Sequence, residues 1–240
     1  MPELKIDGIE LDVPEGWSVL DAAKFLGIEI PTLCYNEGLV PGGNCRLCIV
    51  EIGKGDNSKL VTSCTYPATQ GLNVRTASSR VVKARKLILE LLIAQCPTSK
   101  TLQDLASKFG LKQVRFKPKW DNCILCGLCV RICEQQMMAS AIGFVNRGNN
   151  LKITTPFDKT SDVCRKCGAC IYICPACTLR CIGPDRDKVL CNGCYNSLQP
   201  TCIEVHDNYS CWMGYTGNCG TCVKVPATED NDKKIKIEVK

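Results

Sequence analysis

The alternation of apolar and polar residues predicts a β-hairpin at the N-terminus. Residues 4–6 and 9–13 each alternate between the two classes, as a strand with one buried face does. Asp7 and Gly8 stand between them, and this dipeptide is a strong signal for a two-residue hairpin turn. We therefore expect two antiparallel strands joined at Asp7-Gly8.

A short helix is predicted directly after the hairpin. Ser18 can cap it, Asp21 can complete a capping box, and Gly27 suits the position just beyond its end. A hairpin, a helix and then a cysteine-rich loop form the opening of a β-grasp fold. Later strands are expected at residues 48–52, 60–64 and 72–76.

A longer amphipathic helix is predicted over residues 79–94, with a broad apolar face. The residues expected on the opposite, polar face are Lys83, Arg85, Lys86 and Glu90. Cys96-Pro97 ends the helix, because proline cannot continue one. We interpret it as a core or docking helix rather than a membrane-surface helix. A connector follows, with one short helix expected at residues 102–109 and closed by Gly110.

The C-terminal part has a different pattern. Residues 183–225 intersperse cysteines with glycine, asparagine and proline, so they offer little apolar core and are expected to fold around metal. Residues 227–240 are mostly charged and are expected to form a solvated arm or, given the alternation at 235–239, an edge strand. We assign no chemistry to this tail.

Cysteine usage narrows the candidate chemistry. The 240 residues include 21 cysteines and one histidine. A disulfide scaffold is disfavoured because the chain is long, the count is odd and the N-terminus shows no apolar signal-peptide core. Most cysteines also stand two residues from another, as metal ligands do. The single histidine argues against haem, copper and histidine-rich zinc enzymes.

The charge balance is a weaker guide. The formal net charge of +6 suggests an acidic partner such as nucleic acid, but that count treats every cysteine as neutral. Thiolate-ligated clusters carry a formal charge of about −2 each, so three of them would cancel the excess. No apolar run approaches the roughly 20 residues that span a bilayer. We therefore expect neither nucleic-acid binding nor a membrane span.

Two cysteine quartets carry the clearest chemical signal. Each has three cysteines spaced by two residues and a fourth after three more, as in bacterial dicluster ferredoxins. In that arrangement the fourth cysteine of each quartet ligates the other cluster. The first expected [4Fe–4S] site is therefore Cys123, Cys126, Cys129 and Cys174. The second is Cys164, Cys167, Cys170 and Cys133. Zinc is the alternative, because CxxC pairs also make zinc ribbons.

A further set of cysteines lies in the predicted β-grasp. Its members are Cys34, Cys45, Cys48 and Cys64. Three come from one loop and the fourth is distant, and glycines beside the loop cysteines let backbone N–H groups approach the sulfurs. This pattern suits a [2Fe–2S] cluster, again with zinc as the alternative.

Residues 1–182 resemble the N-terminal iron–sulfur part of the large peripheral subunit of respiratory complex I. They resemble still more closely the small iron–sulfur subunit of NAD-linked hydrogenases and related soluble bifurcating complexes. The resemblance rests on the motifs at residues 31–34 and 43–48, on Cys64, on the helix after Ser79 and on both quartets. It implies that the clusters relay electrons between a separate flavin–NAD(H) subunit and a second redox module. The chain shows no Gly-rich dinucleotide-binding turn of its own.

One departure from that family is visible. The family usually has a His-x3-Cys-x2-Cys-x5-Cys cluster site between the β-grasp and the quartets, whereas this interval contains only Cys96. We infer that this cluster is absent and that Cys96 is a buried thiol at a helix end. His206 lies far downstream and is interpreted as a surface or structural residue.

Eight cysteines remain beyond the quartets. They are Cys177, Cys181, Cys191, Cys194, Cys202, Cys211, Cys219 and Cys222. Two CxxC pairs among them have zinc-ribbon spacing, yet residues 217–223 repeat the form of residues 43–49, which favours iron–sulfur. The sequence leaves open one or two further clusters, zinc ions or unmetallated thiols.

The expected fold class is α+β, in five parts. These are a β-grasp [2Fe–2S] domain (1–78), a helical connector (79–118), a 2×[4Fe–4S] ferredoxin-like domain (119–182), a Cys-rich iron–sulfur or zinc module (183–226) and a charged tail (227–240).

The leading functional hypothesis is a non-catalytic electron-transfer subunit of a cytoplasmic, anaerobic NAD(P)-linked oxidoreductase. The parent complex would be a hydrogenase, a formate dehydrogenase or an electron-bifurcating transhydrogenase. Expected partners are a flavin- and NAD(P)-binding subunit of complex I type, a second redox subunit and ferredoxin. The alternatives are a zinc-binding structural or nucleic-acid-binding protein, and a free soluble multicluster ferredoxin.

Overall fold

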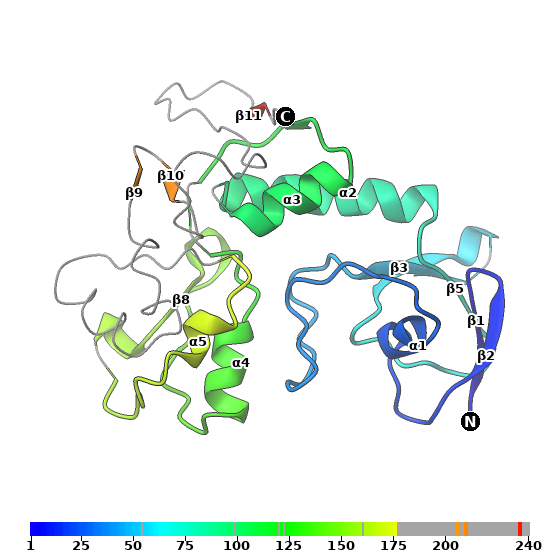
Figure 1. The fold of residues 1–240 in the computed structure, drawn as a ribbon, viewed down its shortest axis with the longest axis horizontal. Helices are drawn as coiled ribbons and strands as arrows, with labels where there is room; N and C mark the ends of the chain where they lie inside the picture. Colours follow the sequence, from blue (N-terminus) through cyan, green and yellow to red (C-terminus); the bar gives the residue numbers. More distant parts are fainter. Residues whose placement is uncertain are drawn as a thin grey trace. The chain divides into compact units, whose positions relative to one another are not determined.

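The computed structural model describes residues 1–176, apart from residues 54, 98, 120, 122 and 160, together with the short segments 205–206, 209–210 and 235–236. The chain divides into two compact units, Met1–Ile88 and Leu89–Lys240. Figure 1 shows the chain as a ribbon and labels most of its helices and strands. None of the described helices is both long and apolar enough to cross a membrane.

A five-stranded sheet with the order β2-β1-β5-β3-β4 forms the framework of the first unit. Its strands are β1 (Glu3–Ile6), β2 (Ile9–Asp12), β3 (Ile49–Ile52), β4 (Lys59–Thr62) and β5 (Leu72–Arg75). β1 pairs with β5 in parallel, whereas the other three pairings are antiparallel. With the helix that follows the hairpin, this mixed sheet has the β-grasp arrangement.

The hairpin turn has the geometry that its sequence predicts. Asp7 and Gly8 have φ values of 48° and 94°, and a type I′ turn needs positive φ at both positions. The Asp7 carboxylate accepts hydrogen bonds from the backbone N–H (2.8 Å) and the hydroxyl of Thr76. The turn is thereby fastened to the segment that follows β5, 69 residues downstream.

Helix α1 (Val19–Phe25) closes the core of the first unit. Ser18 and Asp21 form the expected capping box: the Ser18 hydroxyl accepts from the Asp21 N–H (3.2 Å), and the Asp21 carboxylate accepts from the Ser18 N–H (2.9 Å). The helix buries its apolar residues in one cluster with the inner face of the sheet. That cluster includes Leu4, Ile6, Val19, Leu20, Ala22, Ala23, Val50, Ile52 and Val74.

Helix α2 (Ser79–Gln95) spans the boundary between the two units and ends just before Cys96-Pro97, as expected. Two of the charged residues predicted on its polar face are in fact buried: Arg85 is 5% exposed and Glu90 is 7% exposed. Glu90 is paired with Arg115 (2.7 Å). The prediction was wrong for these two positions because helical periodicity alone gives no information on polar partners from other segments.

A buried carboxylate ties β3 to the start of α2. Glu51 accepts hydrogen bonds from the hydroxyls of Ser78 (2.6 Å) and Ser58 (2.7 Å), which lower its pKa. Arg75 and Arg80 lie within ion-pair distance, at 3.1 and 3.7 Å. Ser78 also accepts from the Val81 N–H (3.3 Å) and so caps the helix.

The second unit is built from short elements. They are α3 (Lys100–Lys108), β6 (Gln113–Val114), α4 (Leu128–Gln135), β7 (Gly143–Val145), β8 (Lys152–Thr154), α5 (Ala169–Tyr172), β9 (Val205–His206), β10 (Tyr209–Ser210) and β11 (Ile235–Lys236). β7 and β8 form an antiparallel hairpin in the long spacer between the quartets, which the sequence did not predict. β11 pairs with β6, so the expected edge strand is present over two residues.

Replacing Ser18 with alanine should loosen α1. The variant lacks the hydroxyl that accepts from the Asp21 N–H, and loss of such a cap costs about 1 kcal/mol. Amides of α1 should then exchange with solvent about fivefold faster in native-state hydrogen exchange. Glu15→Ala, at an exposed position in the preceding loop, is the control. Equal acceleration in both variants would contradict a specific role of the cap.

Candidate metal centres

The four cysteines of the β-grasp are buried, and hydrogen bonds join them in two pairs. Cys34, Cys45, Cys48 and Cys64 are 1%, 4%, 1% and 2% exposed. Cys48 immediately precedes β3 and Cys64 follows β4 closely, and the antiparallel register of these strands aligns Ile49 with Thr62. The two cysteines therefore meet at the same end of the pair, with their sulfurs 3.3 Å apart in a shared hydrogen bond.

The loop before β3 brings backbone N–H groups to the sulfurs. The Cys45 N–H donates to the Cys34 Sγ at 3.4 Å. Gly43 and Arg46 adopt positive φ values of 65° and 60°, which curl the loop tightly. A Cβ on Gly43 would lie 3.3 Å from the Thr65 side chain, so both the backbone conformation and the space favour glycine. The glycine beside the cysteine motif thus has the role that the sequence suggested.

Without metal, these four thiols cannot all ionise. The hydrogen bond between Cys48 and Cys64 lowers the pKa of Cys48 to about 6 and raises the pKa of Cys64. The pKa of Cys45 is raised in the same way by its hydrogen bond with Cys34. The Cys48–Cys64 pair therefore holds one proton between its two sulfurs. Four thiolates in one buried site need positive charge among them, and the donor set of four sulfurs fits iron.

The two quartets of the second unit repeat one local backbone conformation. Leu125 and Lys166 occupy matching positions between cysteines and have φ values of 54° and 52°. Gly127 and Gly168 match in the same way, at 71° and 73°, and directly precede α4 and α5. Repeated left-handed residues wind each Cys-x2-Cys-x2-Cys segment into a compact loop. α4 and α5 also contact each other.

Cys129 of the first quartet lies among the thiols expected to form one cluster site. Burial raises its pKa to about 12, and neighbouring thiols add to the shift because a second negative charge nearby is unfavourable. In decreasing order of effect these neighbours are Cys126, Cys174, Cys123 and Cys170. Cys174, from the other quartet, thus has a larger effect than Cys123 of the same loop.

Cys170 shows the reciprocal arrangement. Burial has the largest effect and raises the pKa of Cys170. The neighbouring thiols of Cys167, Cys133 and Cys164 raise it further, in decreasing order of effect. Cys133 comes from the first quartet, so each loop has the fourth cysteine of the other loop as a neighbour.

Backbone contacts also reach the sulfurs of the quartets. The N–H groups of Leu125 and Ala141 donate to the Sγ atoms of Cys123 and Cys133, both at 3.3 Å. The Gln95 side chain donates to the Cys123 carbonyl (2.9 Å), which holds this loop to the end of α2.

Among the described residues, no three His, Cys, Asp or Glu side chains form a group that could hold a metal ion.

The nine cysteines outside the three proposed sites are Cys96 and eight C-terminal cysteines. Cys96 is 1% exposed at the end of α2, and its sulfur lies 4.0 Å from the Ala176 carbonyl oxygen. The eight C-terminal cysteines lie outside the described residues. They are Cys177, Cys181, Cys191, Cys194, Cys202, Cys211, Cys219 and Cys222. His206 lies in the two-residue strand β9.

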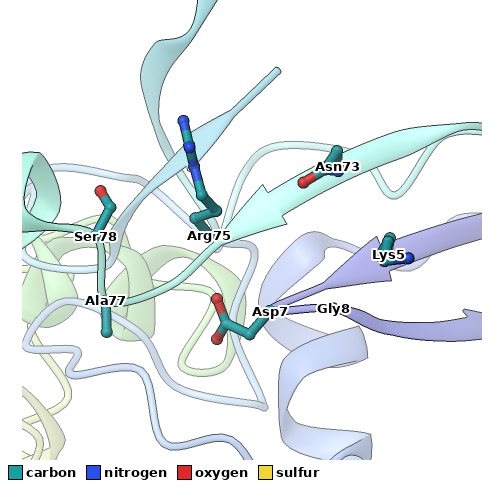
Figure 2. A pocket seen from close by; sticks show the side chains of 7 residues that line it. All are labelled: Lys5, Asp7, Gly8, Asn73, Arg75, Ala77 and Ser78. Atoms are coloured by element: carbon teal, nitrogen blue, oxygen red, sulfur yellow. The ribbon is translucent and has the colours of Figure 1, made fainter. Parts of the chain in front are cut away.

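A solvent-open pocket of about 450 Å³ lies elsewhere on the first unit. Figure 2 shows it beside the hairpin turn and the end of β5, with the Asp7 side chain directed toward the Ala77 segment. Its lining residues are Lys5, Asp7, Gly8, Asn73, Arg75, Ala77 and Ser78. It contains none of the predicted ligands.

Arg85 is the residue near a candidate site that sequence reasoning missed. Its guanidinium donates from Nη2 to the carbonyl of Ile49 (2.7 Å), the residue that follows Cys48. The only sequence signal for its burial was its position one helical turn before the apolar Leu89. Charged residues at such positions are common on surface helices, so this signal is weak.

Two protein families match the chain in the order of these sites. Residues 2–79 match the family described as a 2Fe-2S iron-sulfur cluster binding domain. Residues 122–178 match the 4Fe-4S dicluster domain. The two matches contain the buried β-grasp cysteines and the two quartets, respectively.

Curated relatives share these segments. The chain is 34% identical over 207 residues to the NADP-reducing hydrogenase subunit HndD of Solidesulfovibrio fructosivorans, covering 73% of this chain and 35% of that protein. It is 34% identical over 202 residues to a subunit of the NADH-quinone oxidoreductase of Rhizobium meliloti, covering 73% of this chain and 23% of that protein. The chain therefore spans about a third or less of these relatives' length.

A solved structure agrees. A chain of the NAD+-reducing [NiFe]-hydrogenase in the H2-reduced state is 28% identical, with a TM-score of 0.58, over 68% of this chain and 83% of that one. The protein therefore carries a 2Fe–2S cluster binding domain followed by a 4Fe–4S dicluster domain, and its predicted resemblance to subunits of complex I-type oxidoreductases and NAD(P)-linked hydrogenases is confirmed.

Proposed function

We propose that this chain is an electron-transfer iron–sulfur subunit of a multisubunit NAD(P)-linked flavoprotein oxidoreductase. The observation that carries the proposal is the match of two iron–sulfur domain families to the segments that contain the buried β-grasp cysteines and both quartets. The named relatives are subunits of an NADP-reducing hydrogenase and of an NADH-quinone oxidoreductase, and a chain of an NAD+-reducing [NiFe]-hydrogenase. The chain's own residues make and break no substrate bonds in this role.

The proposed ligand sets follow the three groups. A [2Fe–2S] cluster takes Cys34, Cys45, Cys48 and Cys64. One [4Fe–4S] cluster takes Cys123, Cys126, Cys129 and Cys174, and the other takes Cys164, Cys167, Cys170 and Cys133. Bound clusters supply one-electron transfer, while the protein fixes their positions and adjusts their potentials through N–H···S bonds and burial.

The proposed partners are a flavin- and NAD(P)-binding subunit of complex I type, a second redox subunit and ferredoxin. These partners are proposed because the names of the relatives describe NAD(P)-linked complexes. We further propose that the eight C-terminal cysteines bind one or two additional clusters or zinc ions. An anaerobic iron, sulfide and zinc count per chain tests this last point.

Crossed ligation can be tested by pairing substitutions. Cys133→Ala combined with Cys164→Ala should cost only one [4Fe–4S] cluster, because both residues would serve the same one. Cys133→Ala combined with Cys123→Ala should cost both. Iron and sulfide analysis with EPR spectroscopy distinguishes these results. The reverse pattern would show that each quartet holds its own cluster, and Cys96→Ala is the control expected to lose none.

Gly43→Ala should destabilise the [2Fe–2S] site specifically. The added Cβ would lie 3.3 Å from the Thr65 side chain, and the alanine would have to adopt the positive φ of Gly43. Gly71→Ala is the matched control, since Gly71 has a similar φ of 71° but no atom within 4 Å of an added Cβ. We expect visible circular dichroism of the [2Fe–2S] chromophore to be lost several-fold faster in Gly43→Ala. Similar rates in the two variants would mean that only the backbone conformation matters.

The functional proposal is tested by anaerobic purification of the full tagged chain from its native host. We expect a brown protein that co-purifies with a flavoprotein, and reduction of its clusters by NADH or NADPH in that complex. The chain alone should not be reduced by either nucleotide, because its sequence shows no Gly-rich dinucleotide-binding turn.

Other outcomes would contradict the proposal. A colourless, zinc-containing protein would favour the structural or nucleic-acid-binding alternative. A brown, monomeric protein that captures no flavoprotein would instead favour a free multicluster ferredoxin.

A further inference from the structure

Arg85 is a buried cation inside the first unit. Its side chain belongs to α2, and the residue is 5% exposed. Nη2 donates to the Ile49 carbonyl at 2.7 Å, whereas Nε has no hydrogen-bond partner within the described part of the chain. A guanidinium has five N–H donors, so this one is incompletely satisfied by the protein.

The position of Arg85 is fixed next to a proposed cluster ligand. Ile49 directly follows Cys48, and the Cys48 carbonyl is held by the Ser63 N–H (3.1 Å) and hydroxyl (2.8 Å). Burial lowers the pKa of Arg85 to about 10, and the negative charges that oppose this shift are Cys48 and then Asp7. The guanidinium therefore remains protonated near neutral pH.

No carboxylate pairs directly with this charge. The Asp7 carboxylate acts on it without an ion pair and accepts its hydrogen bonds from Thr76, and no ion pair of Arg85 is found among the described residues. A buried charge without a paired counter-charge is costly, so it normally persists only where another charge offsets it. Two irons, two bridging sulfides and four thiolate ligands together carry a net charge of about −2 when oxidised and about −3 when reduced.

We propose that Arg85 is the counter-charge of the [2Fe–2S] site and raises the reduction potential of the cluster held there. The inference rests on the proposed ligand set of Cys34, Cys45, Cys48 and Cys64. Reduction adds one electron without making or breaking a bond, so a fixed positive charge nearby stabilises the reduced form more than the oxidised form. Arg85 acts through the electric field and is a positioning residue, not a ligand.

The test is an EPR-monitored redox titration of the full chain at pH 7. Arg85→Gln keeps a donor for the Ile49 carbonyl but removes the charge. We expect it to shift the reduction equilibrium of the [2Fe–2S] cluster at least tenfold toward the oxidised form, which equals about 59 mV for one electron. Lys83→Gln is the matched control, because Lys83 is an exposed cation on the same helix. Its shift should stay below twofold.

Each other result has a defined meaning. A shift below twofold in Arg85→Gln, with the cluster retained, would overturn the proposal. If Arg85→Gln does not retain the cluster, Arg85→Met replaces it, because Met buries no polar group. Cluster loss in both variants but retention in Arg85→Lys would support the need for a positive charge. Cluster loss in all three would instead assign Arg85 a role in shaping the Ile49 segment and overturn the proposal.

Failure of the functional proposal would look different. A wild-type chain that shows no [2Fe–2S] signal contradicts the ligand set itself. A wild-type chain with that signal but no flavoprotein partner contradicts the subunit role and leaves the effect of Arg85 measurable.

Discussion

The first unit depends on burying four thiols, two of which lie inside the core that holds its sheet together. Cys48 and Cys64 belong to the same buried cluster as Val50, Ile52 and Val74. Removing thiolates from water is unfavourable and bringing them together adds repulsion, so this core tolerates them only as shared-proton pairs or as ligands to a positively charged centre. The register of β3 and β4, the tight loop around Gly43 and the buried guanidinium of Arg85 all serve this arrangement.

Local signals in the sequence were sufficient for most elements of the described chain. The turn at Asp7-Gly8 and the capping box of Ser18 and Asp21 depend on backbone geometry within a few residues, so their sequence patterns are informative. The burial of Arg85 depends instead on a carbonyl 36 residues earlier. A periodic pattern contains no such partner, which is why the sequence assigned this residue to the polar face.

The same distinction applies to the candidate sites. The spacing of each quartet predicts a winding loop because its length permits few conformations, and the matching φ values of Leu125 and Lys166 show that both loops adopt the same one. Spacing could not predict which sulfurs share a proton in the β-grasp. That depends on how Ile49 and Thr62 are aligned across two strands, a property of the sheet.

The parallel pairing of β1 with β5 has a consequence for synthesis of the protein. Leu4 pairs with Leu72, so β1 can complete its pairing in the sheet only after β5 has been synthesised. All four β-grasp cysteines precede β5 in the chain and leave the ribosome earlier. The nascent protein therefore passes through a stage in which the ligand set is complete while its core is still open to solvent. Iron delivered at that stage meets accessible thiols, whereas iron delivered later meets a closed core.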